Sequence, residues 1–417
     1  MARTVLNKST RLLVIVNVYR PDLGGGVLFS DLCEGLADAD FEVTVKCAYS
    51  YYPEWVDKSG KNGFRIRSTV ENKVRVERHG IYIPTNPNNL LQRLLYEASF
   101  YLSLRRRRPA SKSFDAILVI CPLVGAVAYA AAVKRKTRAP LWLNVQDLSA
   151  QAAAAGGISS SGILTTLMIR VQNYLFSKAD VWSTISSPMV EVLEDLGSST
   201  RSAELIPNWL HQSLAKSIEE QSGRPRRERS NTVHLLYSGN IGTKQDLLQF
   251  CQHLHSTQID FRLRIQGDGG RAPELRSWIA SADDQRFEMH GLSDESELAR
   301  ALFDTDFFLI TEHPGIGSSF IPSKLIPGIC SGTPILAICD NDSPLGDEMG
   351  RFALGPQIKW SNLEDVDPVL NSEMLNSDEY EVWSANTLSR STYYGREQGI
   401  TRCANLIRTM IEKYEDA

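Results

Sequence analysis

Short apolar runs rich in β-branched residues recur along the chain, and longer segments with helical periodicity separate them. This alternation is typical of βα units around a mainly parallel sheet. In the first half of the chain the pattern predicts enough strands for one doubly wound domain. These strands are 11–17, 41–45, 74–78, 114–120, 141–145, 179–184 and 205–206.

The pattern stops in a polar, basic stretch and then restarts. Residues 212–231 include Gly223-Arg-Pro-Arg-Arg-Glu-Arg229 and have the composition of a linker. We therefore expect two Rossmann-like doubly wound α/β domains, residues 1–211 and 232–383. Residues 384–417 carry apolar side chains at helical spacing and should form terminal helices that can cross back to the first domain. The strands predicted for the second domain are 233–237, 261–265, 286–289, 307–310 and 334–338.

The composition is that of an ordinary soluble globular protein. Among the 417 residues, 42% are hydrophobic and 23% are charged, and the net charge is −4. This acidic balance argues against a nucleic-acid binder, which needs a basic surface. The seven cysteines are scattered and never spaced as Cys-x-x-Cys, so neither a disulfide framework nor a zinc site is indicated. The N-terminus does not resemble an export signal, so we expect a cytoplasmic protein.

One uncharged segment has the minimum length of a membrane span. Residues 116–133 contain eighteen residues without a charge. Pro122 and Gly125 interrupt this segment after a β-branched run, and alanines follow. The pattern therefore predicts a buried strand, a turn and a helix.

A basic region follows an apolar helical segment in the first half. Residues 93–138 contain ten basic side chains and two acidic ones. The segment Leu90–Arg108 is rich in leucine and ends in four arginines. Such a helix can lie on an anionic membrane surface, which would make the protein peripheral at the inner face of the membrane. The alternative is a core-packed helix whose cationic end complements the macrodipole.

Three consecutive glycines, Gly24, Gly25 and Gly26, follow the first predicted strand and precede a helix. Open α/β sheets bind ligands at the carboxyl ends of their strands, and glycine lets the backbone approach a ligand closely. The spacing is not that of the Gly-x-Gly-x-x-Gly dinucleotide fingerprint. The cluster is therefore either a ligand contact or a plain turn.

Three loops in the second half each follow a predicted strand and precede a helix. They are Gly239-Asn-Ile-Gly242 with Lys244, Gly267-Asp-Gly-Gly270 with Arg271, and Pro322-Ser-Lys324. The free N–H groups of a helix N-terminus attract anions, and a nearby cation strengthens that attraction. Because the loops should converge at one edge of the sheet, together they suit a diphosphate.

The order and spacing of these motifs resemble the retaining glycosyltransferases of GT-B fold, in the subgroup with a Pro-Ser-Lys donor motif. The likeness includes the run from Pro322 to Leu336 and, in the first half, Val145-Gln-Asp147-Leu148 and Ile206-Pro-Asn208-Trp209. It extends in collinear order over about residues 11–340 and is strongest to enzymes of bacterial surface polysaccharides. It implies two domains that face each other across a cleft, with a nucleotide-sugar donor on the second and a glycan or lipid-linked acceptor on the first.

The resemblance also implies roles for single residues. The backbone at Gly239, Asn240 and Gly242 would meet the phosphates, and Lys244 and Lys324 would neutralise charge on the leaving diphosphate. Asp147 would contact a sugar or acceptor hydroxyl; its alternative role is a helix cap. Such enzymes usually need no metal or other cofactor. The further donor contacts implied are Gly24, Gly25, Gly26, Asn208, Gly267, Asp268, Gly269, Arg271, Glu312, Pro322 and Ser323.

Two positions depart from the family pattern. Ser319 and Pro327 stand where many members carry glutamates, the second of which binds the nucleotide ribose. Two other functions therefore stay open from the sequence. One is an epimerase or hydrolase of nucleotide sugars with the same fold, and the other is a non-catalytic partner derived from such an enzyme.

Overall fold

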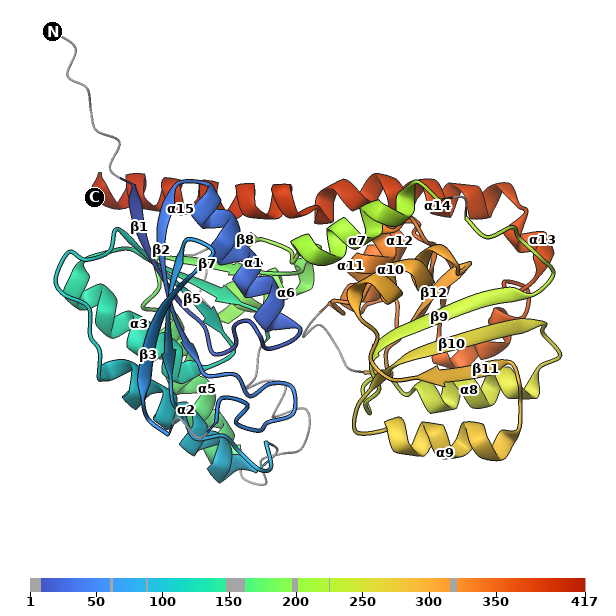
Figure 1. The fold of residues 1–417 in the computed structure, drawn as a ribbon, viewed down its shortest axis with the longest axis horizontal. Coiled ribbons are helices and arrows are strands. Elements are labelled where there is room, and N and C mark those ends of the chain that lie inside the picture. Colours follow the sequence, from blue (N-terminus) through green and yellow to red (C-terminus); the bar gives the residue numbers. More distant parts are fainter. Residues whose placement is uncertain are drawn as a thin grey trace, which may run out of the picture. The chain divides into compact units, whose positions relative to one another are not determined.

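The computed structural model describes residues 9–60, 63–87, 89–147, 162–196, 202–224, 226–315 and 321–416. The chain divides into two compact units. Met1–Pro207 and Gly399–Ala417 form the first unit, and Asn208–Gln398 form the second. Each is an α/β layer structure built on one sheet (Figure 1).

The sheet of the first unit has the strand order β3-β4-β2-β1-β5-β6-β7-β8. Each of the seven predicted strands has a counterpart, and their pairings are parallel. Strand β3 is additional and pairs antiparallel with β4 through a turn at Asn72 and Lys73, both at positive φ. The strands are β1 (Thr10–Ile15), β2 (Phe41–Ala48), β3 (Ile66–Glu71), β4 (Val74–His79), β5 (Ala116–Cys121), β6 (Leu141–Val145), β7 (Val181–Thr184) and β8 (Ala203–Leu205).

Helices cover both faces of this sheet. The crossover from β1 to β2 and the crossover from β5 to β6 run toward opposite ends of the strand order. Because such crossovers are right-handed, their helices lie on opposite faces of the sheet. The C-terminal helix packs against the first of these, where a Cβ on Gly35 would lie 2.6 Å from Ile400 Cδ1. The helices are α1 (Gly25–Asp38), α2 (Leu90–Arg105), α3 (Val124–Thr137), α5 (Gly162–Phe176), α6 (Ser187–Leu196) and α15 (Arg396–Glu415).

The uncharged segment 116–133 folds as the pattern predicts. It forms the buried strand β5, a short turn and the first part of α3. In the described ranges, none of the helices combines the length and the hydropathy that a membrane span needs.

The sheet of the second unit has the order β11-β10-β9-β12-β13-β14, with parallel pairings throughout its described strands. All five predicted strands are present, and β14 is a short addition at the edge. The strands are β9 (Val233–Asn240), β10 (Phe261–Asp268), β11 (Phe287–His290), β12 (Phe307–Thr311), β13 (Ile335–Ile338) and β14 (Gln357–Ile358).

Two apolar layers enclose this sheet. One contains α8 and α9, and the other contains α7, α10 and α11 (Figure 1). The helices are α7 (Gln212–Ser222), α8 (Leu247–Ser256), α9 (Ala272–Ala282), α10 (Glu295–Phe303), α11 (Leu325–Cys330), α12 (Pro344–Phe352), α13 (Ser372–Leu375) and α14 (Asp378–Ser391), with 3-10 helices at Trp360–Val366 and Thr392–Tyr394.

Helix α7 differs from the linker that the sequence predicts for 212–231. Leu214 and Ile218 are buried on one side of α7 and belong to the core that includes α10. Two apolar positions spaced by one helical turn are enough to hold a helix that packs against a partner. Because polar side chains surround these two positions, the helical spacing could not be recognised in the sequence. The boundary between the two units therefore falls earlier than predicted, between Pro207 and Asn208.

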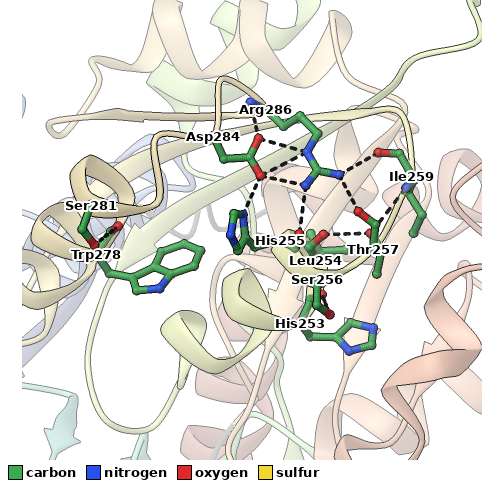
Figure 2. A network of polar contacts seen from close by, with 10 residues as sticks. All are labelled: His253, Leu254, His255, Ser256, Thr257, Ile259, Trp278, Ser281, Asp284 and Arg286. Carbon is green, nitrogen blue, oxygen red and sulfur yellow. Dashed lines mark hydrogen bonds and ion pairs between the residues drawn. The ribbon is translucent and has the colours of Figure 1, made fainter.

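A polar network joins the end of α8 to the start of β11 at the amino edge of the second sheet (Figure 2). The Arg286 guanidinium donates to the Asp284 carboxylate at 2.7 Å and to the carbonyl oxygens of Thr257 and Ile259, both at 3.0 Å. His255 Nδ1 lies 2.8 Å from the same carboxylate. Arg286 and His255 hold the pKa of Asp284 well below its usual range. The network therefore fastens the loop between α8 and β10 to the start of β11.

We expect Asp284→Asn to lower the free energy of unfolding by about 2 kcal/mol at neutral pH, because charge-assisted hydrogen bonds are lost. Because the folded pKa of Asp284 is lowered, its contribution is complete above the unfolded pKa of about 4 and disappears as the pH falls below it. The difference from the wild type, measured by denaturant unfolding, should shrink in acid. Asp283→Asn, at an exposed neighbouring position with positive φ, is the control and should change little. An equal loss in both variants would contradict this role.

Candidate functional site

The ends of β9 and β10 approach each other at two glycines. Gly239 pairs in register with Gly267, and a Cβ on Gly267 would lie 2.0 Å from Gly239 O. Gly239 has φ +128° and Gly269 has φ +151°, which L side chains rarely adopt. A Cβ on Gly269 would also lie 2.5 Å from Ile241 O. These glycines are therefore required by the backbone itself, whatever ligand the loops bind.

Hydrogen bonds lock the two loops together beyond the strands. Ile241 N donates to Asp268 O, and Arg271 N donates to Ile241 O, both at 2.9 Å. Gln245 Oε1 accepts from Gly242 N at 3.1 Å and from Asn240 Nδ2 at 3.2 Å. Sequence reasoning missed Gln245, whose amide engages the N–H group predicted to meet a phosphate. The signal for it was its place directly after Lys244.

Two of the predicted polar residues of the second loop are engaged locally. Asp268 Oδ1 accepts from Gly269 N at 2.8 Å. Arg271 forms an exposed ion pair of 2.6 Å with Glu274 in the first turn of α9. The Arg271 charge is thus partly balanced by a neighbour on its own helix.

Lys324 reaches across from the start of α11 to the end of β9. Its amino group lies 2.8 Å from the hydroxyl of Tyr237 and 4.0 Å from the centre of that ring. A Cβ on Gly239 would lie 3.7 Å from Lys324 Nζ, an ordinary contact distance, so the amino group lies directly beside this glycine. Burial lowers the pKa of Lys324 to about 7, although the carboxylate of Glu312 favours the charged form. In this setting an anion bound nearby would stabilise the charged form of Lys324.

Glu312 lies directly after β12 and is buried. Burial raises the pKa of Glu312 to about 7, while the hydrogen bond from Ser343 Oγ at 3.1 Å and the charges of Lys324 and Lys244 oppose this rise. The next residue, His313, donates its backbone N–H to Lys244 O at 2.7 Å. The structure thus brings the two predicted lysines and Glu312 to the same edge as the glycine loops.

The remaining residues of the third loop lie next to Lys324. Pro322 O accepts from Leu325 N at 3.0 Å in the turn that opens α11, and the side chain of Ser323 is exposed. Pro327 lies within α11. Ser319 lies outside the described residues.

In the first unit, the three glycines lie at the junction of β1 and α1. Gly24 has φ +61° with open space around it, and Gly25 and Gly26 form the first turn of α1. The loop is held by Asp22, a buried carboxylate that accepts from Ser50 Oγ at 2.6 Å. Asp22, which sequence reasoning did not single out, also accepts from Tyr51 N and Tyr52 N and so ties this turn to the loop after β2. The open space at Gly24 is also compatible with a ligand contact.

Asp147 lies just beyond β6, at the carboxyl edge of the first sheet. The alternative role, a helix cap, concerns the segment 148–161, which lies outside the described residues. Glu97 on α2 lies at this edge too: its carboxylate accepts from Gly125 N at 2.8 Å, and burial raises its pKa to about 7. Both carboxylates act on Cys121 at the end of β5 and raise its thiol pKa further, beyond the effect of burial. The sequence offered no signal for Glu97, because it is far from β5 along the chain.

Asn208, which the resemblance implies as a donor contact, is the first residue of the second unit. Over the described part of the chain, no three His, Cys, Asp or Glu side chains are grouped in a way that could hold a metal ion.

Sequence comparison finds glycosyltransferases. Residues 24–209 match the model of the glycosyl transferase 4-like domain. The Escherichia coli K12 protein named as the colanic acid biosynthesis glycosyl transferase WcaI is 26% identical over 349 residues, which cover 79% of this chain and 82% of WcaI.

Solved structures with the same fold cover nearly the whole chain. Sucrose-phosphate synthase of Thermosynechococcus elongatus has a TM-score of 0.68 at 13% identity, covering 97% of this chain and 100% of that one. HepE of Anabaena, in complex with UDP and glucose, has a TM-score of 0.64 at 13% identity, covering 96% and 100%. The predicted fold class, two doubly wound α/β domains of the GT-B type, is confirmed.

We expect Gly267→Ala to destabilise the second unit by about 3 kcal/mol, because the added methyl overlaps the Gly239 carbonyl and the strands must separate. Differential scanning calorimetry measures the change. Gly270→Ala is the matched control, since nothing lies within 4 Å of a Cβ there. Equal unfolding temperatures for the two variants would show that the strands do not meet as described.

Proposed function

We propose that this chain is a GT-B glycosyltransferase and that it transfers a sugar from a nucleotide-diphosphate sugar to a hydroxyl acceptor. One observation carries the proposal: the glycine loops of β9 and β10 converge with Lys324 at a single edge of the second sheet. The HepE structures, which contain UDP and UDP-glucose, support a nucleotide-sugar donor. The name of WcaI supports a place in bacterial surface polysaccharide synthesis.

In this proposal the diphosphate of the donor lies over the loop ends. Gly239 presents no side chain there, so the phosphates can approach the backbone. Lys324 and Lys244 neutralise the charge that develops on the leaving diphosphate as the bond to the sugar breaks. Glu312, beside Lys324, would bind a hydroxyl of the donor.

Proton uptake should accompany donor binding. With a pKa near 7, Lys324 is largely neutral in mildly alkaline solution without ligand. A diphosphate stabilises the ammonium form and raises this pKa, so binding draws a proton from solution. The raised pKa of Glu312 acts in the same direction, since its ionisation would place a negative charge beside the phosphates.

We therefore expect the affinity for UDP to fall as the pH rises from about 7 to about 9, by up to about tenfold per pH unit. Lys324→Met should weaken UDP binding and flatten this dependence, as measured by isothermal titration calorimetry in buffers of different ionisation enthalpy. Lys216→Met, which removes an exposed lysine of α7, is the control and should titrate like the wild type. An unchanged pH profile in Lys324→Met would remove Lys324 from the phosphate site.

The acceptor in this proposal is a glycan or a lipid-linked sugar that binds the first unit. Asp147 is at the carboxyl edge of that sheet and would contact the reacting hydroxyl. Gly24 leaves open space at the same edge for an acceptor or donor group. We propose retention of anomeric configuration, a hexose or related sugar as the transferred group, and no metal requirement.

The transfer reaction should depend on both substrates. With a panel of UDP-, GDP- and ADP-sugars, we expect nucleoside diphosphate release only when bacterial lipid-linked oligosaccharides are added, and EDTA should not abolish it. Asp147→Asn should slow release by about a hundredfold or more if the carboxylate takes part in the reaction. Epimerised or free sugar formed from donor alone would favour an epimerase or hydrolase instead. Binding of UDP without turnover of any donor would favour a non-catalytic partner.

We also propose that the protein is peripheral at the inner face of the membrane. Leu91, Leu95 and Leu102 of α2 are exposed, although the opposite side of α2 is packed in the core. An exposed apolar stripe that ends in arginines suits an anionic lipid surface. The core-packed alternative therefore accounts for one side of α2 only.

A further inference from the structure

The first unit contains a basic pocket of about 340 Å³ between the carboxyl ends of α2 and α3. We define the basic pocket by its four cationic side chains and its two aromatic walls. No Asp or Glu is among the residues that line it. These six side chains are Arg105, Arg108, Arg135, Lys136, Tyr101 and Tyr129.

The acids near this pocket are already paired. Glu77 is buried with Lys46 at 2.7 Å and also lies 3.7 Å from Arg107. On α3, Lys134 pairs with Asp180 at 2.5 Å. By contrast, the structure records no ion pair with a described residue for any of the four pocket cations. Their charge is therefore available to an anion.

Compensation of the helix dipoles does not account for this arrangement. Arg105 lies in the last turn of α2, and Arg135 and Lys136 lie in the last turn of α3, where a cation is favoured. Arg108 lies beyond the end of α2, and dipole compensation requires no hollow between the two helices. Four like charges around one cavity repel each other unless a ligand neutralises them.

The pocket is held in shape before any ligand binds. The carbonyl oxygen of Arg107 accepts from Lys46 Nζ at 2.9 Å and from the Tyr129 hydroxyl at 3.4 Å, which fixes the chain that follows α2. The Arg105 guanidinium lies 5.5 Å from the ring centre of Tyr101, a cation–π contact that positions it. A preformed site loses less entropy on binding.

We propose that the basic pocket binds a phosphate group. Guanidinium groups match phosphate oxygens with paired hydrogen bonds, and three arginines with one lysine can neutralise a dianion. The volume is large enough for a phosphate with part of the group that carries it.

The position of the pocket separates it from the site of sugar transfer. Helix α3 leads from the carboxyl end of β5 back to the amino end of β6, so Arg135 and Lys136 in its last turn lie toward the amino edge of the sheet. Gly24 and Asp147 lie at the carboxyl edge of the same sheet. The phosphate bound in the pocket is therefore not the group that reacts.

The exposed face of α2 points to the source of this phosphate. Leu91, Leu95 and Leu102 are exposed by 67%, 47% and 58%, at spacings of four and seven residues. One helical stripe therefore joins them and continues to Arg105 in the pocket. Apolar side chains that enter a bilayer would bring the pocket to the level of the lipid phosphates. The pocket thus takes the headgroup of an anionic phospholipid, an inference that rests on the peripheral membrane association proposed above and not on the transfer reaction.

The test compares three double variants of the full chain. Arg108→Gln with Arg135→Gln removes two charges from the basic pocket. Lys73→Gln with Lys413→Gln removes two exposed charges elsewhere on the first unit. Leu95→Gln with Leu102→Gln breaks the apolar stripe. Binding is measured by cosedimentation with phosphatidylcholine vesicles, with and without phosphatidylglycerol, and by titration with inorganic phosphate in the presence of saturating UDP.

We expect the pocket variant to bind phosphatidylglycerol vesicles about tenfold or more weakly and to lose most of its response to inorganic phosphate. The stripe variant should lose vesicle binding alone, and the control should retain both. Equal losses in the pocket variant and the control would overturn the site, since attraction averaged over the surface would then explain binding. A phosphate response without vesicle binding by the wild type would assign the pocket to a soluble phosphate and overturn the membrane source.

Two further measurements distinguish these outcomes from a folding defect and from a failure of the donor site. Thermal unfolding of each variant identifies a folding defect, because the folded fraction is then known independently of binding. UDP binding reports on the donor site of the second unit. If the wild type did not bind UDP, the proposed sugar transfer would be contradicted. The vesicle result could still be interpreted.

Discussion

The second unit depends on one close approach, the meeting of β9 and β10 at Gly239 and Gly267. A methyl group on Gly267 would overlap the Gly239 carbonyl, so the two strand ends can lie side by side only without side chains. Lys324, whose amino group is held against Tyr237, lies beside Gly239 at this bare edge. An edge that must be bare for the strands to pair is also an edge where a ligand can reach the backbone.

The two edges of the second sheet have different chemistry. At the carboxyl edge of the second sheet the polar groups are only partly satisfied, and the pKa values of Lys324 and Glu312 move toward neutrality because both are buried. At its amino edge, Arg286 and Asp284 satisfy one another and the nearby carbonyls (Figure 2). Polar groups that are fully paired add stability, whereas groups with shifted pKa values gain most when a ligand arrives. This contrast separates the candidate site from a structural network of similar composition.

Sequence reasoning predicted the strands well, and it failed where a contact depends on distant parts of the chain. Strand β5 is a short buried apolar run and β10 alternates apolar and polar residues, so both could be predicted from pattern alone. The apolar and polar residues of β3 alternate only weakly, and the strand is mostly exposed. It forms because the turn at Asn72 reverses the chain, so that β4 pairs with it. Helix α7 is held by two buried apolar residues in a polar segment. The role of Glu97 depends on which segments meet in space, and no spacing along the chain encodes that. Gln245, by contrast, bonds to Asn240 and Gly242 within its own loop.

By itself the sequence determined the two α/β units, the glycine loops and the lysines that could serve a phosphate, because period, turn chemistry and charge are local properties. Only the tertiary structure decided how those groups act. It brought Lys324 across to Tyr237, buried Glu312 beside it, and gathered basic residues of α2 and α3 around one cavity. Burial and proximity set the electrostatics of a side chain, and both arise from the packing of segments that are far apart along the chain.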